Sequence, residues 1–278
     1  MLDRLLRAAY RRLEPGARNA LRTSLLLEQR DAMPEPIERF DESPVLVLAP
    51  HSDDEVIGCG GVIARHVRAG ATVHVVFMTD GRWGDGSLFS PGLSAAERQQ
   101  RQSTLVALRQ EEARCAARLL GSQHLHFLDL PDGALRVNEQ SVALMRERLA
   151  TIRPQIVYLP FVYDLHEDHW QTNRVFAAAV RQLPPDRAVM VRGYEVWTPL
   201  LANRVADISD LMPLKREALA CFKSQLRDQD YTRIVDGLNA YRSSGCFGGR
   251  GFAEAFHEAP LAGYLRLVAA AGGRGAAP

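Results

Sequence analysis

The chain has 278 residues, of which 46% are hydrophobic and 24% are charged, and its formal net charge is +1. This composition is typical of a globular protein that is long enough for one large domain. The near-neutral charge favours no nucleic-acid partner, and no apolar run approaches the roughly 20 residues that span a bilayer.

The first segment predicts an amphipathic basic helix. Residues 1–13 place leucines, an alanine and a tyrosine on one helical face and four arginines elsewhere. Contact with an anionic membrane surface is one interpretation, and packing on its own domain or on a second subunit of a homo-oligomer is the other. The arginines interrupt any apolar core, so the segment is not a secretory signal. We therefore expect a cytoplasmic protein, with membrane association left open.

Four cysteines lie far apart in the chain and form no C-x-x-C pair. Neither a thiolate zinc site nor a redox motif is therefore encoded. Such spacing fits a reducing cytoplasm, where cysteines act as small buried hydrophobic side chains, while pairing of distant cysteines in the fold stays open. The four are Cys59, Cys115, Cys221 and Cys246.

After a polar, proline-containing linker, short apolar runs alternate with helical patterns. Strands alternating with helices favour a mostly parallel sheet that is covered on both faces. We predict a single-domain α/β fold, a Rossmann-like αβα sandwich over residues 44–268, with a helical extension and linker (1–43) before it and a flexible tail (269–278) after it. The predicted strands lie at 45–50, 72–81, 125–133, 156–161 and 188–197, and the predicted helices at 56–70, 94–121, 139–152, 170–182, 213–225 and 232–243.

Polar clusters follow three of these strands, at residues 51–55, 79–81 and 164–169. Ligands of open parallel sheets bind beyond the carboxyl ends of the strands, so we expect the clusters to share one rim. Gly58 and Gly60 lack the full G-x-G-x-x-G spacing, and carboxylates precede them where a pyrophosphate would need free N–H groups. These glycines therefore indicate close helix–strand packing and a tight loop rather than a dinucleotide site.

The histidines and carboxylates of the clusters indicate a metal site. A lone histidine at a strand end is more often a hydrogen-bonded loop residue than a ligand. Two acidic clusters with histidines, each following a predicted strand, favour a shared divalent cation instead. A set of two histidines and one carboxylate suits zinc and also iron(II).

The same residues closely resemble the signature of the PIG-L/LmbE-like deacetylases. "PHSDDE" followed by "GCGG" resembles "(A/P)HPDDE...G.GG", and "HEDH" resembles "HPDH", with Ser52 and Glu167 replacing prolines at positions that are not ligands. "TDG", "LRQEEARCAARLLG", "LPDG" and the C-terminal stretch from "YEVWTPL" to "FKSQ" extend the resemblance over roughly residues 44–256. The resemblance implies a zinc-dependent N-deacetylase of glucosaminyl compounds.

Residue by residue, the resemblance implies that His51, Asp54 and His169 bind zinc. Asp53 is then the general base that activates water and later returns the proton to the leaving amine. The resemblance implies that His166 stabilises the oxyanion of the tetrahedral intermediate. Side chains of adjacent residues on an extended segment diverge, so Asp53 and Asp54 can serve different roles.

Two further carboxylates, Glu55 and Asp168, are interpreted as groups that orient the ligands, with capping of loops or helices as the alternative. Arg109 and Asp132 match family positions that hold sugar hydroxyls, although Arg109 could instead pair with a glutamate, Glu112, on its own helix.

Other segments around the predicted cleft receive weaker interpretations. Arg82 and Trp83 follow "TDG" and are candidates for lining the cleft, whereas His124 and His126 flank a strand and are interpreted as structural. The glycine-rich segment 242–256 is a candidate for a loop that moves over the cleft.

We therefore expect a metal-dependent hydrolase that removes the N-acetyl group from an N-acetylglucosamine-type glycoconjugate, using zinc-activated water and an aspartate base. The alternative is an amide or ester hydrolase of a non-sugar conjugate, of thiol or natural-product type, on the same scaffold. A metal-holding protein without catalysis is a third hypothesis, which the complete set of catalytic positions disfavours. The expected partner is a small-molecule or lipid-linked amino sugar, and the aglycone is open.

Overall fold

The computed structural model describes residues 12–14, 16–17, 33–184 and 188–272. The chain divides into two compact units, residues 1–34 and residues 35–278. The helix predicted for residues 1–13, and with it the membrane hypothesis, lies outside the described residues except for Arg12 and Leu13. The second unit begins before the predicted boundary at residue 44, because Glu35–Pro36 form strand β1 and pair with a later strand.

Within the described residues, eight strands form one sheet in the order β1-β7-β8-β6-β5-β2-β3-β4. The five predicted strands are confirmed, and each is parallel to its neighbours among them. They are β2 (Val45–Ala49), β3 (Val73–Thr79), β4 (His124–Leu130), β5 (Ile156–Pro160) and β6 (Met190–Tyr194). Their alternation with helices produces the predicted mostly parallel α/β sheet.

Two strands were not predicted, β7 (Arg204–Asp207) and β8 (Ala253–Pro260). β8 runs antiparallel to both β6 and β7. The hypothesis that segment 242–256 is a loop that moves over the cleft is therefore wrong for residues 253–256. These residues are buried, because they form the start of β8 in the middle of the sheet.

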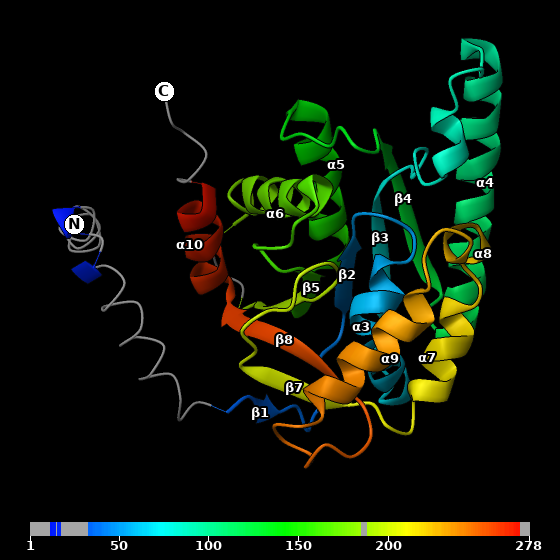
Figure 1. Cartoon of the computed structure of the whole chain (residues 1–278). Helices are drawn as coiled ribbons and strands as arrows, with labels where there is room; N and C mark the ends of the chain where they lie inside the picture. Colours follow the sequence, from blue (N-terminus) through cyan, green and yellow to red (C-terminus); the bar gives the residue numbers. More distant parts are fainter. Residues whose placement is uncertain (1–11, 15, 18–32, 185–187, 273–278) are drawn as a thin grey trace. The chain divides into compact units, whose positions relative to one another are not determined.

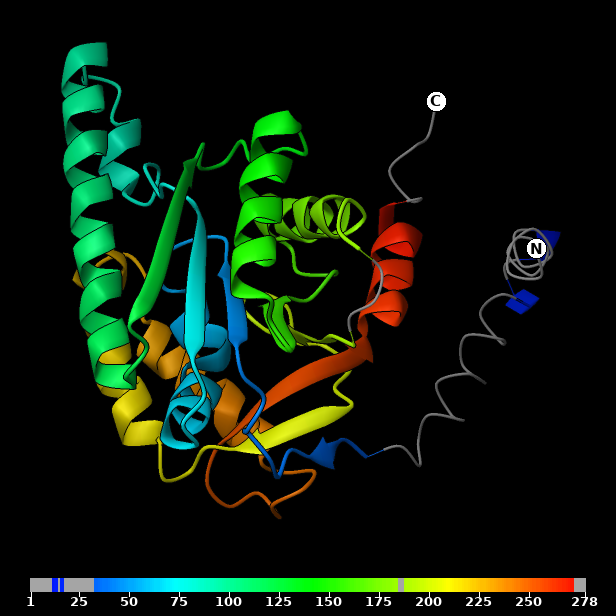
Figure 2. The same ribbon diagram turned by 180° about the vertical axis from the view of Figure 1, so that it is seen from behind.

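Helices cover both faces of the sheet, as expected (Figure 1). One core contains side chains of α3 (Asp54–Arg68), α4 (Ala95–Leu120), α7 (Met212–Leu219) and α9 (Tyr231–Arg242). The other contains side chains of α5 (Glu139–Ile152), α6 (Glu167–Val180) and α10 (Leu261–Gly272). Both views place α4 beside β4 at one edge of this unit and α10 beside β8 (Figures 1 and 2). The short helices η2 (Gly86–Phe89) and α8 (Lys223–Leu226) lie in connections.

Helix boundaries follow local sequence signals. Ser94 and Glu97 form the predicted capping box of α4, and Gly121 ends this helix with a φ of 81°. At the other end of the chain, α10 includes residues 269–272, which were assigned to the tail, because its alanines favour helix. None of the helices that the structure describes is long and apolar enough to cross a membrane.

The "GCGG" glycines serve packing, as predicted. A side chain at Gly58 would overlap the ring of Tyr194. Helix α3 is kinked at Cys59, and beyond the kink the N–H groups of Gly61 and Val62 each donate to the buried carboxylate of Glu254, both at 2.8 Å. Close contact with the sheet therefore holds the helix that begins at the polar cluster.

The cysteines differ in their pairing. Cys59 is buried and unpaired, whereas Cys115 and Cys221 form a disulfide with a Cα–Cα distance of 5.9 Å. Distant pairing, which the sequence left open, thus occurs between α4 and the turn that follows α7. The bond attaches the segment that leads into α8 to the long helix α4.

From three stacked histidines on β3 and β4 we expect the stability of the fold to decrease at acidic pH. The ring of His74 stacks on those of His124 and His126, and burial, with these neighbours, lowers the pKa of His74 to about 4. Because the unfolded chain binds this proton near pH 6.5, stability contributed by neutral His74 is lost as pH falls from about 6.5 to 4. His74→Gln should flatten this part of the stability curve.

Urea unfolding of both proteins at pH 7, 6, 5 and 4 measures this difference. Acidification should lower the unfolding free energy of the parent more than that of His74→Gln. A gap that stays constant across this range would contradict the assignment.

Candidate active site

The predicted polar clusters meet at the switch point of the sheet. β3 and β4 lie on one side of β2, whereas β5 and β6 lie on the other. Ligands of open α/β sheets bind beyond the carboxyl ends of the strands at such a point. The loop after β2 carries residues 50–53, and the loop after β5 carries residues 161–166, so both clusters reach one site.

The three predicted metal ligands converge on one carboxylate oxygen. Oδ2 of Asp54 lies 3.2 Å from Nδ1 of His51 and 3.2 Å from Nε2 of His169. The side chain of His169 is fully buried, and the other two are nearly so. Asp54 stands in the first turn of α3 and His169 in the first turn of α6, so two helix starts and one strand end supply the donors.

This geometry fits a divalent cation. Tetrahedral ligands with bonds of about 2.0–2.2 Å lie roughly 3.3–3.5 Å apart, close to the separations around Asp54. Nε2 of His169 is buried and faces Asp54 without an aligned hydrogen bond. Buried polar atoms normally have a partner, and a shared cation would provide one. A compact group with donor atoms within 4.8 Å of one another is formed by His51, His166 and His169, so two of the three predicted ligands share it with His166.

Carboxylates face the second nitrogen of each ligand histidine. Nε2 of His51 lies 3.2 Å from Asp132 and 3.3 Å from Asp168, and these three residues form a second compact donor group. Nδ1 of His169 lies 3.2 Å from Asp164. A carboxylate in this position orients the imidazole and raises the basicity of the ligating nitrogen. Asp168 thus lies where an orienting group is expected, and Asp164, which had no predicted role, has the same relation to His169.

Asp53, the predicted base, has a strained backbone at the start of α3. Its φ of 137° is rare for a residue with a side chain. Its carboxylate lies 3.7 Å from the guanidinium of Arg109, and its N–H donates to Glu55 at 3.1 Å. Burial raises the pKa of Asp53 to about 7, against the effect of Arg109 and with a contribution from Asp54. A cation bound beside it would lower this pKa again.

Glu55 has the backbone contact of the capping alternative. Its carboxylate accepts from the backbone of Asp53 rather than contacting a ligand side chain. Burial, with the charge of Asp53, raises the pKa of Glu55 to about 8. Glu55 therefore holds the backbone that carries the candidate base.

Replacing Asp53 with glycine is expected to stabilise the metal-free protein. Strain at such a φ costs roughly 1–3 kcal/mol, and glycine adopts this conformation readily. Asp53→Ala is the matched control, because it also removes the buried carboxylate but keeps the strain. Thermal unfolding of both chelator-treated variants should give the glycine variant the higher Tm. Equal values would show that the backbone at this position stores no strain.

His166 caps α6 and faces the cavity. Its Nδ1 accepts a hydrogen bond from the N–H of Asp168 at 3.2 Å, so the neutral ring carries its proton on Nε2. Burial, followed by the charges of His51 and His169, lowers the pKa of His166. The ring is therefore a neutral hydrogen-bond donor at pH 7.

Arg109 lines the cavity from α4. Its Nη2 donates to the carbonyl of Ser52 at 2.9 Å, and its Nη1 donates to the carbonyl of Gly81 at 3.2 Å. The alternative pairing with Glu112 is not supported, because Glu112 accepts from the backbone N–H and the hydroxyl of Ser224 instead. Arg109 thus joins the loops after β2 and β3 beside the candidate base.

A cavity of 550 Å³ opens at this site. Asp132 and Trp83 line it, and the N–H of Trp83 donates to Asp132 at 2.8 Å. Arg82, the other candidate after β3, pairs with Asp80 and is not among the lining residues. Trp197, Gln225 and Tyr231 also line it and were not identified from the sequence. They come from segments after β6 and around α8 and α9, where no sequence motif pointed to a site.

Comparison with known proteins places this site in a family. A family model described as PIG-L, GlcNAc-PI de-N-acetylase, matches residues 46–180. The diacetylchitobiose deacetylase of Thermococcus kodakarensis is 30% identical over 66% of this chain and 71% of its own. The 4-oxalmesaconate hydratase of Pseudomonas putida is 27% identical over 73% of this chain and 83% of its own.

Among solved structures, the N,N'-diacetylchitobiose deacetylase from Pyrococcus horikoshii has a TM-score of 0.64 and 27% identity. The match covers 84% of this chain and 85% of that one. Similarity in both sequence and fold thus extends beyond the two motifs to most of the sheet and its helices.

Proposed function

The chain belongs to the PIG-L family, and we propose that it hydrolyses the acetamide of an N-acetylglucosamine-type glycoconjugate. The observation that supports the proposal is that His51 and His169 both face the carboxylate of Asp54, while His51, Asp53, Asp54 and His166 line one cavity. The products of the reaction are acetate and a primary amine.

The proposal assigns metal binding to His51, Asp54 and His169, with zinc, which is typical of the family, as the expected ion and iron(II) as the alternative. When bound, such an ion polarises the acetamide carbonyl and lowers the pKa of a water molecule.

The chain's own residues supply the proton transfers and the orientation. The Asp53 carboxylate accepts the proton of the attacking water and then delivers it to the amine nitrogen as the C–N bond breaks. Nε2–H of His166 donates to the oxygen on which negative charge develops. Arg109 and Asp132 are proposed to position the sugar hydroxyls.

Two other reactions are the competing hypotheses. Hydration of an unsaturated polycarboxylate, by analogy with the hydratase relative, would require cations that pair with the carboxylates of the substrate. Among the residues that line the cavity, Arg109 is the one Lys or Arg side chain, and it already donates to two backbone carbonyls. Apart from the proposed metal ion, the cavity therefore offers a carboxylate no free cationic side chain, which favours a neutral acetamide. The other competing hypothesis, hydrolysis of a non-sugar amide or ester conjugate, is distinguished by comparing substrates.

The proposed function is tested by acetate release from matched substrates. Metal-loaded protein is incubated with N-acetylglucosamine glycosides, N-acetyl amino acids, and an unsaturated dicarboxylate, and products are followed by proton NMR. Acetate from the glycosides alone is expected. Acetate from the amino acids alone would favour the non-sugar alternative, and loss of the vinyl signal would favour hydration.

The membrane hypothesis for residues 1–13 stays a proposal, and with it a lipid-linked substrate. Flotation with anionic liposomes should separate the full chain from a chain that lacks residues 1–15. Equal partitioning would remove the hypothesis.

A further inference from the structure

We propose that this cavity binds a second ring of the substrate against Trp197 and Tyr231, so that the substrate class is a neutral glycoconjugate of at least two rings. The inference rests on the proposed function, because the first ring is the sugar that carries the acetamide.

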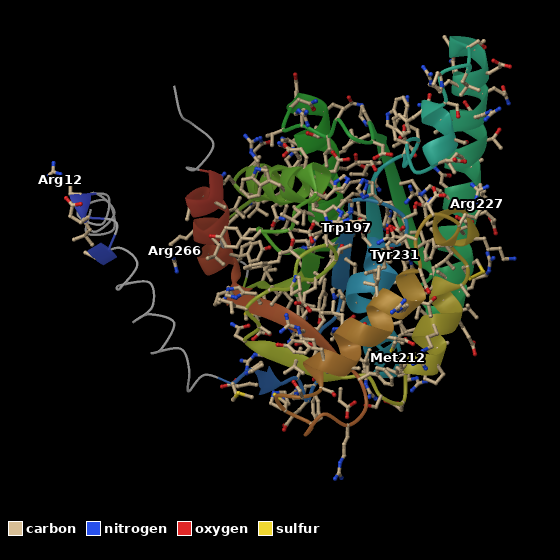
Figure 3. All side chains as sticks on the ribbon, viewed as in Figure 1. Arg12, Trp197, Met212, Arg227, Tyr231 and Arg266 are labelled. Atoms are coloured by element: carbon tan, nitrogen blue, oxygen red, sulfur yellow. A yellow bond between two sulfur atoms is a disulfide. The ribbon has the colours of Figure 1, made fainter. Side chains whose placement is uncertain are left out.

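Two pairs of aromatic side chains contribute to the cavity. Trp83 and Phe89 stack with ring centroids 5.5 Å apart, and both line the cavity. Trp197 and Tyr231 also line it and meet edge to face at 6.1 Å. Figure 3 labels the second pair and shows the two side chains near one another. Trp83 is 38% exposed and Trp197 41% exposed, so each tryptophan offers an accessible ring face.

The strand order places the two pairs on opposite sides of the metal ligands. Trp83 follows β3 and Trp197 follows β6, while the ligand loops follow β2 and β5, which lie between those strands. Three strand spacings separate β3 from β6, which is about 14 Å. A substrate that contacts both pairs must therefore extend beyond a single sugar ring.

Backbone hydrogen bonds fix the positions of both tryptophans relative to the proposed metal ligands. The N–H of Trp83 donates to Asp132, which faces His51. The N–H of Trp197 donates at 2.9 Å to Asp164, which faces His169. The backbone N–H of each tryptophan thus donates to a carboxylate that faces a ligand histidine. These bonds fix the positions of the two loops relative to the reacting centre.

The segment around α8 connects the two aromatic pairs. Nε2 of Gln225 donates to the carbonyl of Gly84, next to Trp83, at 3.1 Å. At the start of α9, Tyr231 contacts Trp197. This segment therefore closes one side of the cavity between the pairs and limits the direction in which a substrate can extend.

The cavity offers an anionic second group no free Lys or Arg side chain. Among the lining residues, Arg109 is the one Lys or Arg, and it is engaged with backbone carbonyls. An aglycone that carries a carboxylate or phosphate at Trp197 would therefore have no guanidinium or ammonium group among the lining residues to pair with. A neutral ring would instead bury its apolar face against the indole of Trp197. Because Arg109 and Asp132 lie with Trp83, we place the acetamido sugar there and the linked ring at Trp197.

The test compares kcat/KM for N,N'-diacetylchitobiose, for N-acetylglucosamine, and for an N-acetylglucosamine glycoside with a carboxylate in its aglycone. The parent protein should prefer the disaccharide over the monosaccharide by about tenfold, the effect of one good aromatic contact. The carboxylate glycoside should show no such gain. Trp197→Ala should bring the disaccharide close to the monosaccharide, and Trp197→Phe should retain most of the preference.

Leu201→Ala is the matched control. Leu201 is 70% exposed four residues further along and is absent from the residues that line the cavity. Its substitution should leave the disaccharide preference as in the parent. A parent without any preference, or one that Trp197→Ala leaves unchanged, would overturn the inference while the proposed function stands.

A binding measurement separates the inference from the proposed function. Calorimetry with the Asp53→Asn protein should show tighter binding of the disaccharide than of the monosaccharide, and Trp197→Ala in that background should remove the difference. If these binding differences are found but the parent protein releases no acetate, the second-ring site is supported and deacetylation is rejected. Equal binding of both sugars would reject the site.

Discussion

Asp53→Asn is expected to lower kcat by about 10²- to 10⁴-fold while the protein still binds metal. An amide in place of the carboxylate keeps the size of the side chain but cannot accept the proton of the attacking water, and general-base catalysis contributes on this scale. Asparagine has the same side-chain shape as aspartate and therefore adds no new steric strain at the φ of 137°, so the start of α3 should be retained. Steady-state acetate release and bound metal, measured on the same preparation, test both parts.

The matched control for Asp53→Asn is Asp85→Asn. Asp85 is a surface carboxylate that caps η2 and pairs with Arg227, outside the cavity lining. Its substitution should change turnover little. If Asp53→Asn kept full activity with normal metal content, Asp53 could not be the base, and the proton transfers would need another group.

His169→Ala is expected to remove both metal and turnover. His169 is fully buried and faces Asp54 with one ring nitrogen and Asp164 with the other. Its loss leaves two ligands and an uncompensated pair of carboxylates, so affinity for zinc should fall far below that of the parent. Metal content after gel filtration should drop from about one ion per chain towards zero.

His166→Ala provides the contrast to His169→Ala. It removes a neighbouring histidine of the same cluster that caps α6 and has no assigned role as a ligand. It should keep the metal and lose turnover. If His169→Ala retained a full equivalent of metal, or if both variants lost it equally, the assignment of the ligands would be wrong.

Much of the fold follows from local patterns in the sequence. The runs that became β2 and β5 are short and continuously apolar because both faces of these strands are covered, and "SAAE" and Gly121 mark the two ends of α4. β8 lacked such a pattern, because a charged residue, Glu254, is buried in it. That carboxylate is satisfied by Lys215 and by the kinked helix α3, which are distant in the sequence.

In the site, too, features that follow from local sequence could be predicted, and contacts between distant residues could not. Both polar clusters could be placed at one rim because parallel strands end on the same side. The position of Trp197 could not be predicted, since it depends on a hydrogen bond to Asp164, which lies 33 positions away in the sequence. Tyr231 likewise reaches the cavity only through the packing of α9.

The most direct test of the account is release of primary amine from an N-acetylglucosamine conjugate by chelator-treated protein as zinc is added back. We expect no release without metal and a rise that saturates near one equivalent of zinc per chain. Full release from metal-free protein would contradict the account. No release from any conjugate, with one zinc shown to be bound, would contradict the proposed reaction.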